Sequence, residues 1–190
     1  FDTTTDFNSD FGPVDNTNLS AERGLSDFDQ RHKLVVAGVL QSPWANPVLA
    51  SFELSPIVSY NSGHPFNLLA GADVNGDRHS TNDRPIGAGR NTGIGPNYVT
   101  LDMRLARSVK LSEKASVQFL AEGFNLTNRT NFASVNNVVG PLFGLPLSVG
   151  GAGATTFNVH GNAGLSPSQP LGFTSIFAAR EIQLGVRMSF

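Results

Sequence analysis

The residues of this sequence best suited to chemistry are oxygen ligands at alternate positions of a polar segment. Asp73, Asn75 and Asp77 have the spacing with which calcium loops present carboxylate and amide oxygens to a hard cation. Arg78 stands where a helix–loop–helix calcium loop has glycine, and Arg84 stands where it has glutamate. The alternative is a polar loop that uses Asn, Gly and Asp to form turns. Calcium is thus the one cofactor that the sequence suggests.

Other patterns for catalysis or metal binding are missing from the sequence. His32, His64, His79 and His160 are far apart, and the chain contains no cysteine. No Gly-x-Ser-x-Gly segment is present, so we expect no enzyme of the serine-hydrolase type and no enzymatic activity in general. The formal net charge of −2 comes without a basic cluster, which argues against nucleic acid as a partner.

A second set of charged residues lies within segments that alternate between polar and apolar side chains. An ionised side chain is costly in hydrocarbon, so in a membrane such residues must face a wet or plugged lumen while their apolar neighbours face lipid. In a soluble protein the same alternation would bury the apolar side. The candidates for lumen-facing charges are Asp102, Arg104, Glu122, Glu181 and Arg187.

Five long segments have this strand character, although alternation is poor in the first and Pro56 interrupts the second. About thirteen residues in a strand tilted by ~40° cover roughly 30 Å, the thickness of a bilayer core. Strands of globular proteins are about half as long. The predicted strands are residues 28–41, 49–63, 98–110, 115–128 and 175–190.

The connections between these strands alternate in length. Residues 42–48 and 111–115 are short turns, whereas 64–97 and 132–173 are long and rich in Gly, Asn and Pro. Outer-membrane barrels alternate in this way because their periplasmic turns are short and their extracellular loops long. The longest apolar run, Leu34 to Leu40, is too short for a spanning helix. We therefore predict an all-β, antiparallel transmembrane β-barrel fragment of about five up-and-down strands.

The end of the chain resembles the C-terminal signal of outer-membrane barrel proteins. Gln183, Gly185, Met188 and Phe190 occupy its polar, glycine, hydrophobic and terminal aromatic positions. The resemblance implies that this last strand pairs through its open edge with the barrel-assembly machinery.

Several further segments, in order along the chain, are similar to TonB-dependent receptors that carry a carboxypeptidase-regulatory-like domain. The resemblance implies a 22-stranded barrel with an N-terminal plug, which together take up a ligand actively. Residues 1–190 would then be the C-terminal part of one barrel domain, with the plug and the TonB-contacting region upstream of Phe1. The matching segments are Glu22–Gly24, Ser26–His32, Ser62–Phe66, Asp73–Asp77, Asn82–Pro85, Gly89–Gly93 and Phe124–Phe132.

These expectations place the chain in the bacterial outer membrane, with lipid, the assembly machinery, TonB and a transported ligand as partners. One alternative is a structural or adhesive surface barrel that transports nothing. A second is a secreted, soluble β-sandwich.

Overall fold

The computed structural model describes residues 13–44, 46, 50–145 and 166–190. Among these residues the regular structure consists of β-strands alone. No helix within the described ranges is long and apolar enough to cross a bilayer. The chain divides into two compact units, which alternate along the sequence. The sheet unit contains residues 32–61, 98–131 and 177–190, and the loop unit contains residues 1–31, 62–97 and 132–176.

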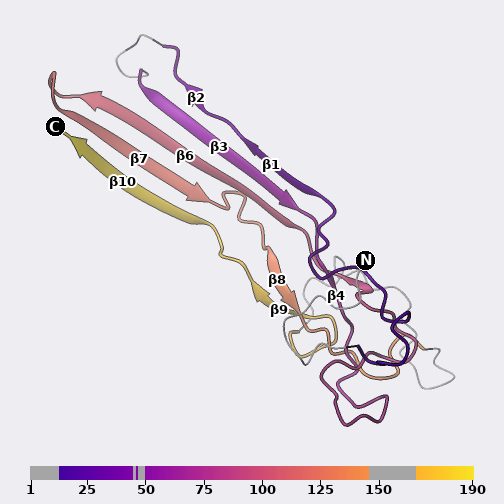
Figure 1. The fold of residues 1–190 in the computed structure, drawn as a ribbon. Coiled ribbons are helices and arrows are strands. Elements are labelled where there is room, and N and C mark those ends of the chain that lie inside the picture. Colours follow the sequence, from indigo (N-terminus) through magenta and orange to yellow (C-terminus); the bar gives the residue numbers. More distant parts are fainter. Residues whose placement is uncertain (1–12, 45, 47–49, 146–165) are drawn as a thin grey trace. The chain divides into compact units, whose positions relative to one another are not determined.

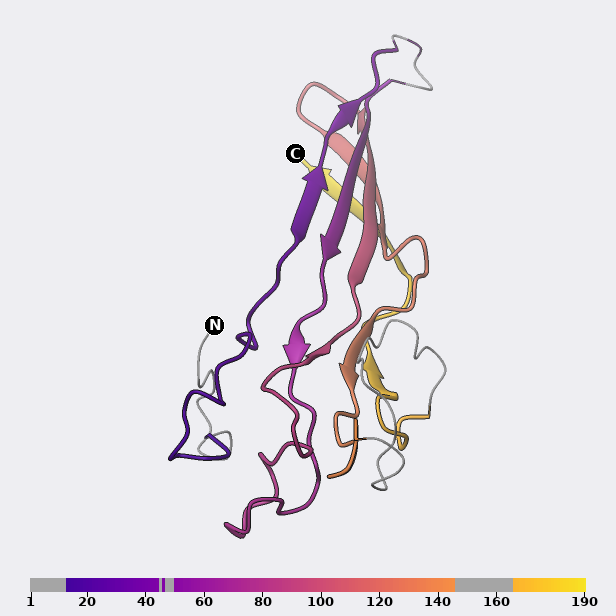
Figure 2. The same ribbon diagram turned by 90° about the vertical axis from the view of Figure 1, so that its right-hand side faces the viewer.

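The sheet unit is an antiparallel meander in which each long strand pairs with the next one along the chain, in the order β1-β3-β6-β7-β10. β2 pairs with β3 beside β1, and β1 and β10 are the two edge strands (Figures 1 and 2). The predicted all-β, antiparallel, up-and-down architecture is confirmed, as an open sheet. The strands are β1 (Lys33–Ala37), β2 (Leu40–Gln41), β3 (Phe52–Asn61), β6 (Tyr98–Lys110), β7 (Ser116–Phe124) and β10 (Glu181–Ser189).

The first predicted strand begins at Lys33 rather than at residue 28, and it is split into β1 and β2. The register is nevertheless continuous, since Ala37 faces Ile57 and Leu40 faces Leu54. Between them, the Gly38 amide donates a hydrogen bond of 3.1 Å to the carbonyl oxygen of Pro56. Proline has no N–H with which to return this bond. The interruption expected from Pro56 is therefore a missing ladder bond and not a bulge.

The predicted fourth and fifth strands are both too long. β7 ends at Phe124 instead of residue 128, because Asn125 (φ 47°) and Asn128 (φ 51°) take left-handed conformations that turn the chain out of the sheet. The fifth predicted strand, residues 175–190, joins the last two residues of β9 (Phe173–Ile176) to β10, although the two strands belong to different sheets. Asparagine visits the left-handed region more readily than most residues, but alternation of polar and apolar residues carries no signal for it.

The sequence led us to expect long connections without strands, whereas the structure contains short strands in both of them. β4 (Pro65–Phe66) pairs with β5 (Gly93–Ile94), and β8 (Phe132–Val135) pairs with β9. A small core forms around Leu68, Leu171 and Phe173, and the ring of Phe173 stacks on Phe132 with centroids 3.6 Å apart. Loop segments distant in sequence thus bury apolar side chains against one another and form a compact unit, and the expectation of a single barrel domain stays a prediction.

Candidate functional site

The sheet has two chemically different faces. Residues directly opposite one another in antiparallel strands lie on the same face, so the registers define each face across all the strands. The pairs Leu54–Leu105, Leu105–Ala121 and Ala121–Leu184 carry one such row from β3 to β10. We call this the apolar face. Its strand residues are Leu34, Val36, Leu40, Phe52, Leu54, Pro56, Val58, Tyr60, Val99, Leu101, Met103, Leu105, Arg107, Val109, Val117, Phe119, Ala121, Gly123, Ile182, Leu184, Val186 and Met188.

Many large side chains of the apolar face are open to the surroundings. Leu184 is 82 % exposed, Ile182 66 % and Leu40 61 %. A soluble sheet would cover such a face with another layer, whereas the described chain leaves it open. A contiguous apolar surface of this extent requires an apolar medium or partner.

Aromatic residues mark the two ends of the apolar face. Phe52 and Phe119 lie toward the short turns, and Tyr60 lies at the opposite end of β3. The eight-residue step from Phe52 to Tyr60 spans about 27 Å of strand, or roughly 20 Å along an axis tilted by ~40°. Membrane barrels have an outer apolar band of about 25 Å between two aromatic girdles, and the spacing here is similar.

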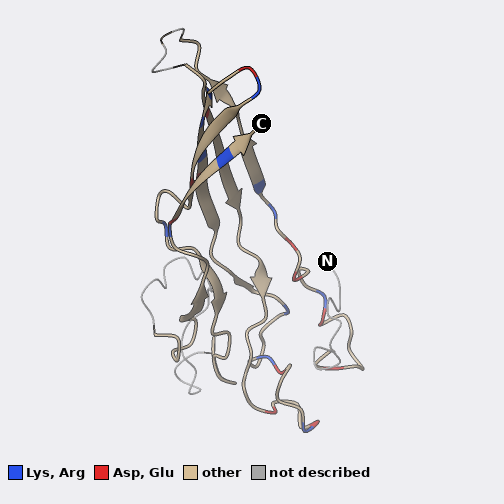
Figure 3. Ribbon diagram, turned by 90° about the vertical axis from the view of Figure 1, so that its left-hand side faces the viewer, with Lys and Arg blue, Asp and Glu red and all other residues tan. Residues whose placement is uncertain are grey.

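The opposite, polar face carries all five of the charges predicted to share one side: Asp102, Arg104, Glu122, Glu181 and Arg187. Arg104 and Glu122 are registered neighbours, with Nε and Oε1 3.6 Å apart. β1 departs most from the two-faced pattern, because Val35 and Ala37 on the polar face are apolar as well, and Ile57 and Leu120 are further apolar residues of that face. Figure 3 shows how sparse the charged residues are along the strands and how they gather in the turn between β6 and β7.

Two asparagines of the segment Phe124–Phe132 form hydrogen bonds at the ends of the sheet strands. They do so at the strand ends that lie away from the short turns. Asn131 is 2 % exposed, and its side-chain amide pairs with both the N–H and the C=O of Val99, at 2.9 and 2.8 Å. The Asn125 main-chain N–H donates to Asp102 Oδ1 at 2.8 Å, and its side chain donates to the carbonyl oxygen of Ala178. The Asn131 side chain thus forms the two hydrogen bonds that a neighbouring strand would otherwise form with Val99. Sequence reasoning placed residues 124–128 in the fourth strand and quoted the whole segment for its family resemblance, but it gave these asparagines no role.

The loop unit contains a buried ion pair that sequence reasoning also missed. Arg84 donates two hydrogen bonds of 2.7 Å to the two carboxylate oxygens of Glu22. Both side chains are more than nine-tenths buried. The pair joins segments 62 residues apart, and both residues lie in segments that carried the resemblance. The available signal in the sequence was the set of segments that resemble TonB-dependent receptors, but such a resemblance does not say which residues pair.

A second network joins the same parts of the loop unit around Asn91, which is 2 % exposed. Its side chain donates to the carbonyl oxygen of Leu25 at 2.7 Å and to the carboxylate of Asp27. Its main-chain N–H donates to Asn67 Oδ1, and the Asn67 carbonyl accepts from Asn137. Buried polar groups that are paired in this way hold irregular segments in one conformation.

The calcium candidates lie together in a hydrogen-bonded turn. The two carboxylate oxygens of Asp73 accept main-chain N–H groups of Gly76 and Arg78, and Asn75 Oδ1 accepts that of Asp77. A hydrogen bond from the His79 main chain is the largest cause that lowers the pKa of Asp77 below its ordinary value. These oxygens now serve the turn, and calcium binding stays a prediction.

No group of three or more His, Asp or Glu side chains in the described ranges is arranged to hold a metal ion. The Nε2 atom of His64 lies 3.1 Å from Nε2 of Gln30. The main-chain N–H of His79 donates a hydrogen bond to the carboxylate of Asp77. His160 lies outside the described residues.

The four residues of the C-terminal pattern lie on or directly after the edge strand β10. Gln183 faces Glu122, Gly185 faces Leu120 and Met188 faces Val117. A Cβ on Gly185 would lie 3.6 Å from Leu120, an ordinary contact, so packing in this chain does not require glycine there. Phe190 is 98 % exposed and therefore contributes little to this fold.

Comparison with known proteins gives one match. A family model described as "Outer membrane beta barrel domain" matches residues 1–88 and 86–160. No curated protein and no solved structure matches significantly.

Proposed function

Because this chain belongs to the outer-membrane β-barrel domain family and is located in the outer membrane, we propose that it forms wall and extracellular loops of a TonB-dependent receptor. The observation that carries the proposal is the combination of an open apolar face on the sheet with long connections that fold into a unit of their own. Lipid would cover the apolar face. The charged residues of the polar face would line the lumen.

The open edges support a larger parent barrel. β1 and β10 each have a partner strand on one side only, among the described residues. In hydrocarbon, unpaired backbone groups are costly, so sheets that span the outer membrane are closed. Closed barrels have at least about eight strands, and this sheet supplies five on its main path. Further strands of the same protein would complete the wall.

The loop unit supports a receptor role. A loop that only connects strands needs neither a buried ion pair nor buried asparagines, whereas a ligand site needs loops held in one conformation. Glu22–Arg84 and the Asn91 network hold three stretches of chain together. A structural or adhesive surface barrel would also use such loops, so the decisive difference is coupling to TonB.

The test uses the complete protein in detergent, titrated with the periplasmic domain of TonB by calorimetry. A receptor should bind it at a 1:1 ratio, and binding should be lost when the segment that contacts TonB is deleted. The barrel itself, assayed by its resistance to unfolding in cold SDS, should be unchanged by the deletion. A folded barrel without measurable TonB binding would favour the structural or adhesive role.

We further propose that Gln183, Gly185, Met188 and Phe190 are read by the barrel-assembly machinery. Since Phe190 is 98 % exposed, its deletion should leave the stability of the refolded barrel nearly unchanged. The level of the protein in the outer membrane should nevertheless fall severalfold, as measured by surface labelling. Phe177→Ala, which changes a half-exposed phenylalanine outside this pattern, is the control. Normal surface levels after deletion of Phe190 would reduce the pattern to an ordinary last strand.

A further inference from the structure

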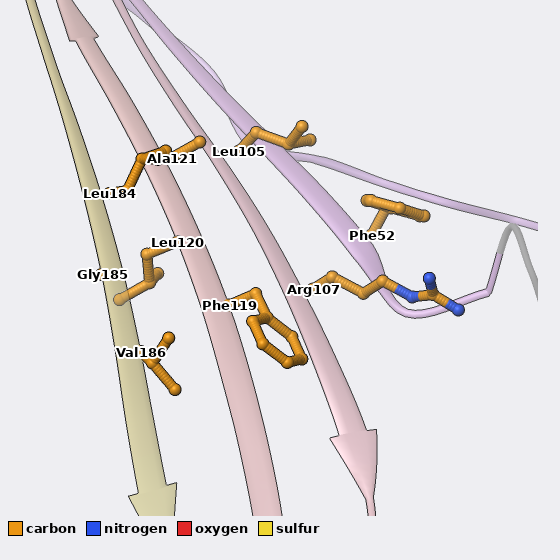
Figure 4. A pocket seen from close by; sticks show the side chains of 9 residues that line it. All are labelled: Phe52, Leu105, Arg107, Phe119, Leu120, Ala121, Leu184, Gly185 and Val186. Carbon is orange, nitrogen blue, oxygen red and sulfur yellow. The ribbon is translucent and has the colours of Figure 1, made fainter.

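The apolar face contains a shallow hollow of about 530 Å³ toward the short turns (Figure 4). Two rows of registered residues line it: Leu105, Ala121 and Leu184 in one, and Phe52, Arg107, Phe119 and Val186 in the other. The small side chain of Ala121 lies between Leu105 and Leu184, and because it is small it leaves open space between them. Its volume lies within the range of small-molecule sites, and its lining is mostly apolar.

Arg107 is the one charged side chain among the described strand residues of the apolar face. Its Cζ lies 5.0 Å from the centroid of the Phe52 ring, a cation–π contact at the rim of the hollow. An arginine on a lipid-facing surface is costly near the bilayer centre but is tolerated near the interface, where it reaches the headgroups.

The position of Arg107 along β6 agrees with an interfacial depth. It lies three residues before Lys110, where β6 ends and the turn of residues 111–115 begins. Phe52 is the first residue of β3, so both lie at the end of the sheet that carries the short turns. Short turns are periplasmic in outer-membrane barrels, and the periplasmic leaflet is the nearest lipid layer.

We propose that this hollow is a binding site for a phospholipid of the periplasmic leaflet. Arg107 would donate hydrogen bonds to the lipid phosphate, for which a guanidinium has the matching geometry. One acyl chain would lie over Ala121, between Leu105 and Leu184. The chemistry favours a phosphate with an attached hydrocarbon chain over a free anion, because Arg107 is at the edge of an apolar groove. The proposal rests on the membrane orientation given above and is independent of TonB.

The test measures lipid retention by native mass spectrometry of the complete protein in an uncharged detergent, titrated with dioleoylphosphatidylglycerol. Arg107→Gln should weaken retention roughly tenfold, since it removes one charge-assisted bond. Ala121→Leu, which fills the groove and leaves Arg107 in place, should weaken it as well. Lys110→Gln is the matched control, because Lys110 is on the same strand and near the same end but faces the other way. It should bind as the unchanged protein does. Resistance to cold SDS shows that each variant is folded.

Four results would overturn the inference. Equal losses for Arg107→Gln and Lys110→Gln would show general charge attraction. Displacement of the lipid by millimolar inorganic phosphate would show an anion site without a chain-binding groove. Retention of lipopolysaccharide in place of phosphatidylglycerol would put this end of the sheet at the outer leaflet. Absence of TonB binding would leave the inference standing, whereas unchanged lipid retention in both site variants would end it.

Discussion

Leu68 in the loop unit is fully buried, whereas Leu184 in the sheet unit is 82 % exposed. The contrast extends to ion pairs, because the loop unit buries Glu22 and Arg84 while the sheet keeps Arg104 and Glu122 half open. The loop unit therefore makes its stabilising contacts within itself. The sheet unit leaves much of its apolar surface for its surroundings. The loop unit and the sheet unit thus suit different surroundings. Substitutions should show whether a given side chain lies in protein, in water or in lipid.

The largest effect should come from the buried pair of the loop unit. Glu22→Gln leaves Arg84 charged and buried without its counter-ion, which should cost the loop unit about 3–5 kcal/mol. Hydrogen exchange of peptides from residues 62–97 would measure the loss. Glu122→Gln breaks the exposed pair with Arg104, and it should cost less than about 1 kcal/mol. Similar costs for the two variants would contradict the contrast between the units.

The next effect tests the solvent of the sheet. Ile182→Arg should destabilise the protein by about 2–4 kcal/mol in lipid vesicles, because its row lies midway between those of Phe52 and Tyr60 and so places the charge near the centre of the hydrocarbon. Gln183→Arg, one residue later on the opposite face, should change stability by less than about 0.5 kcal/mol. Both side chains are exposed in this chain, so neither substitution removes internal packing. Refolding into vesicles bypasses cellular assembly, which keeps the proposed role of Gln183 out of the measurement. Equal costs would mean that the apolar face does not meet lipid.

A smaller effect is expected where the sheet ends. Asn131→Leu fills a similar volume but leaves the N–H and C=O of Val99 without their partner, at about 1–3 kcal/mol. Faster exchange of the Val99 amide proton would report this loss locally. Thr130→Leu, an exposed neighbour, is the control and should leave that proton protected. Unchanged protection in Asn131→Leu would show that the amide is not needed to end the strands.

The smallest effect concerns the acidic turn at Asp77. The main-chain bond from His79 and the side-chain bond from Asn75 lower the pKa of Asp77, so the folded turn binds the proton less readily than the unfolded chain. Its stabilising contribution is therefore present above the ordinary aspartate pKa of 3.8 and is lost as the pH falls through the lower folded value. NMR titration should find an order–disorder change at residues 75–79 in acid. Asp77→Asn should remove the contribution of Asp77 to that pH dependence, which is measured at the His79 amide proton.

The two-faced sheet was predictable from the sequence because a period of two is a local signal. Alternation placed Asp102, Arg104 and Glu122 on one face before any pairing was known, and the registers confirmed it. Loop length likewise gave the meander, since strands joined by tight turns pair with their neighbours. The interruption at Pro56 also followed from the residue type alone.

The tertiary structure decided what depends on contacts between distant segments. Nothing local pairs Glu22 with Arg84, or turns Asn131 into a partner for Val99, because each bond joins residues more than 30 positions apart. Alternation alone puts Arg107 among the apolar positions of its strand, but only the register brings Phe52 and Phe119 to its sides. Periodicity reports which side of a strand a residue occupies, whereas packing between strands and loops determines what that side chain meets.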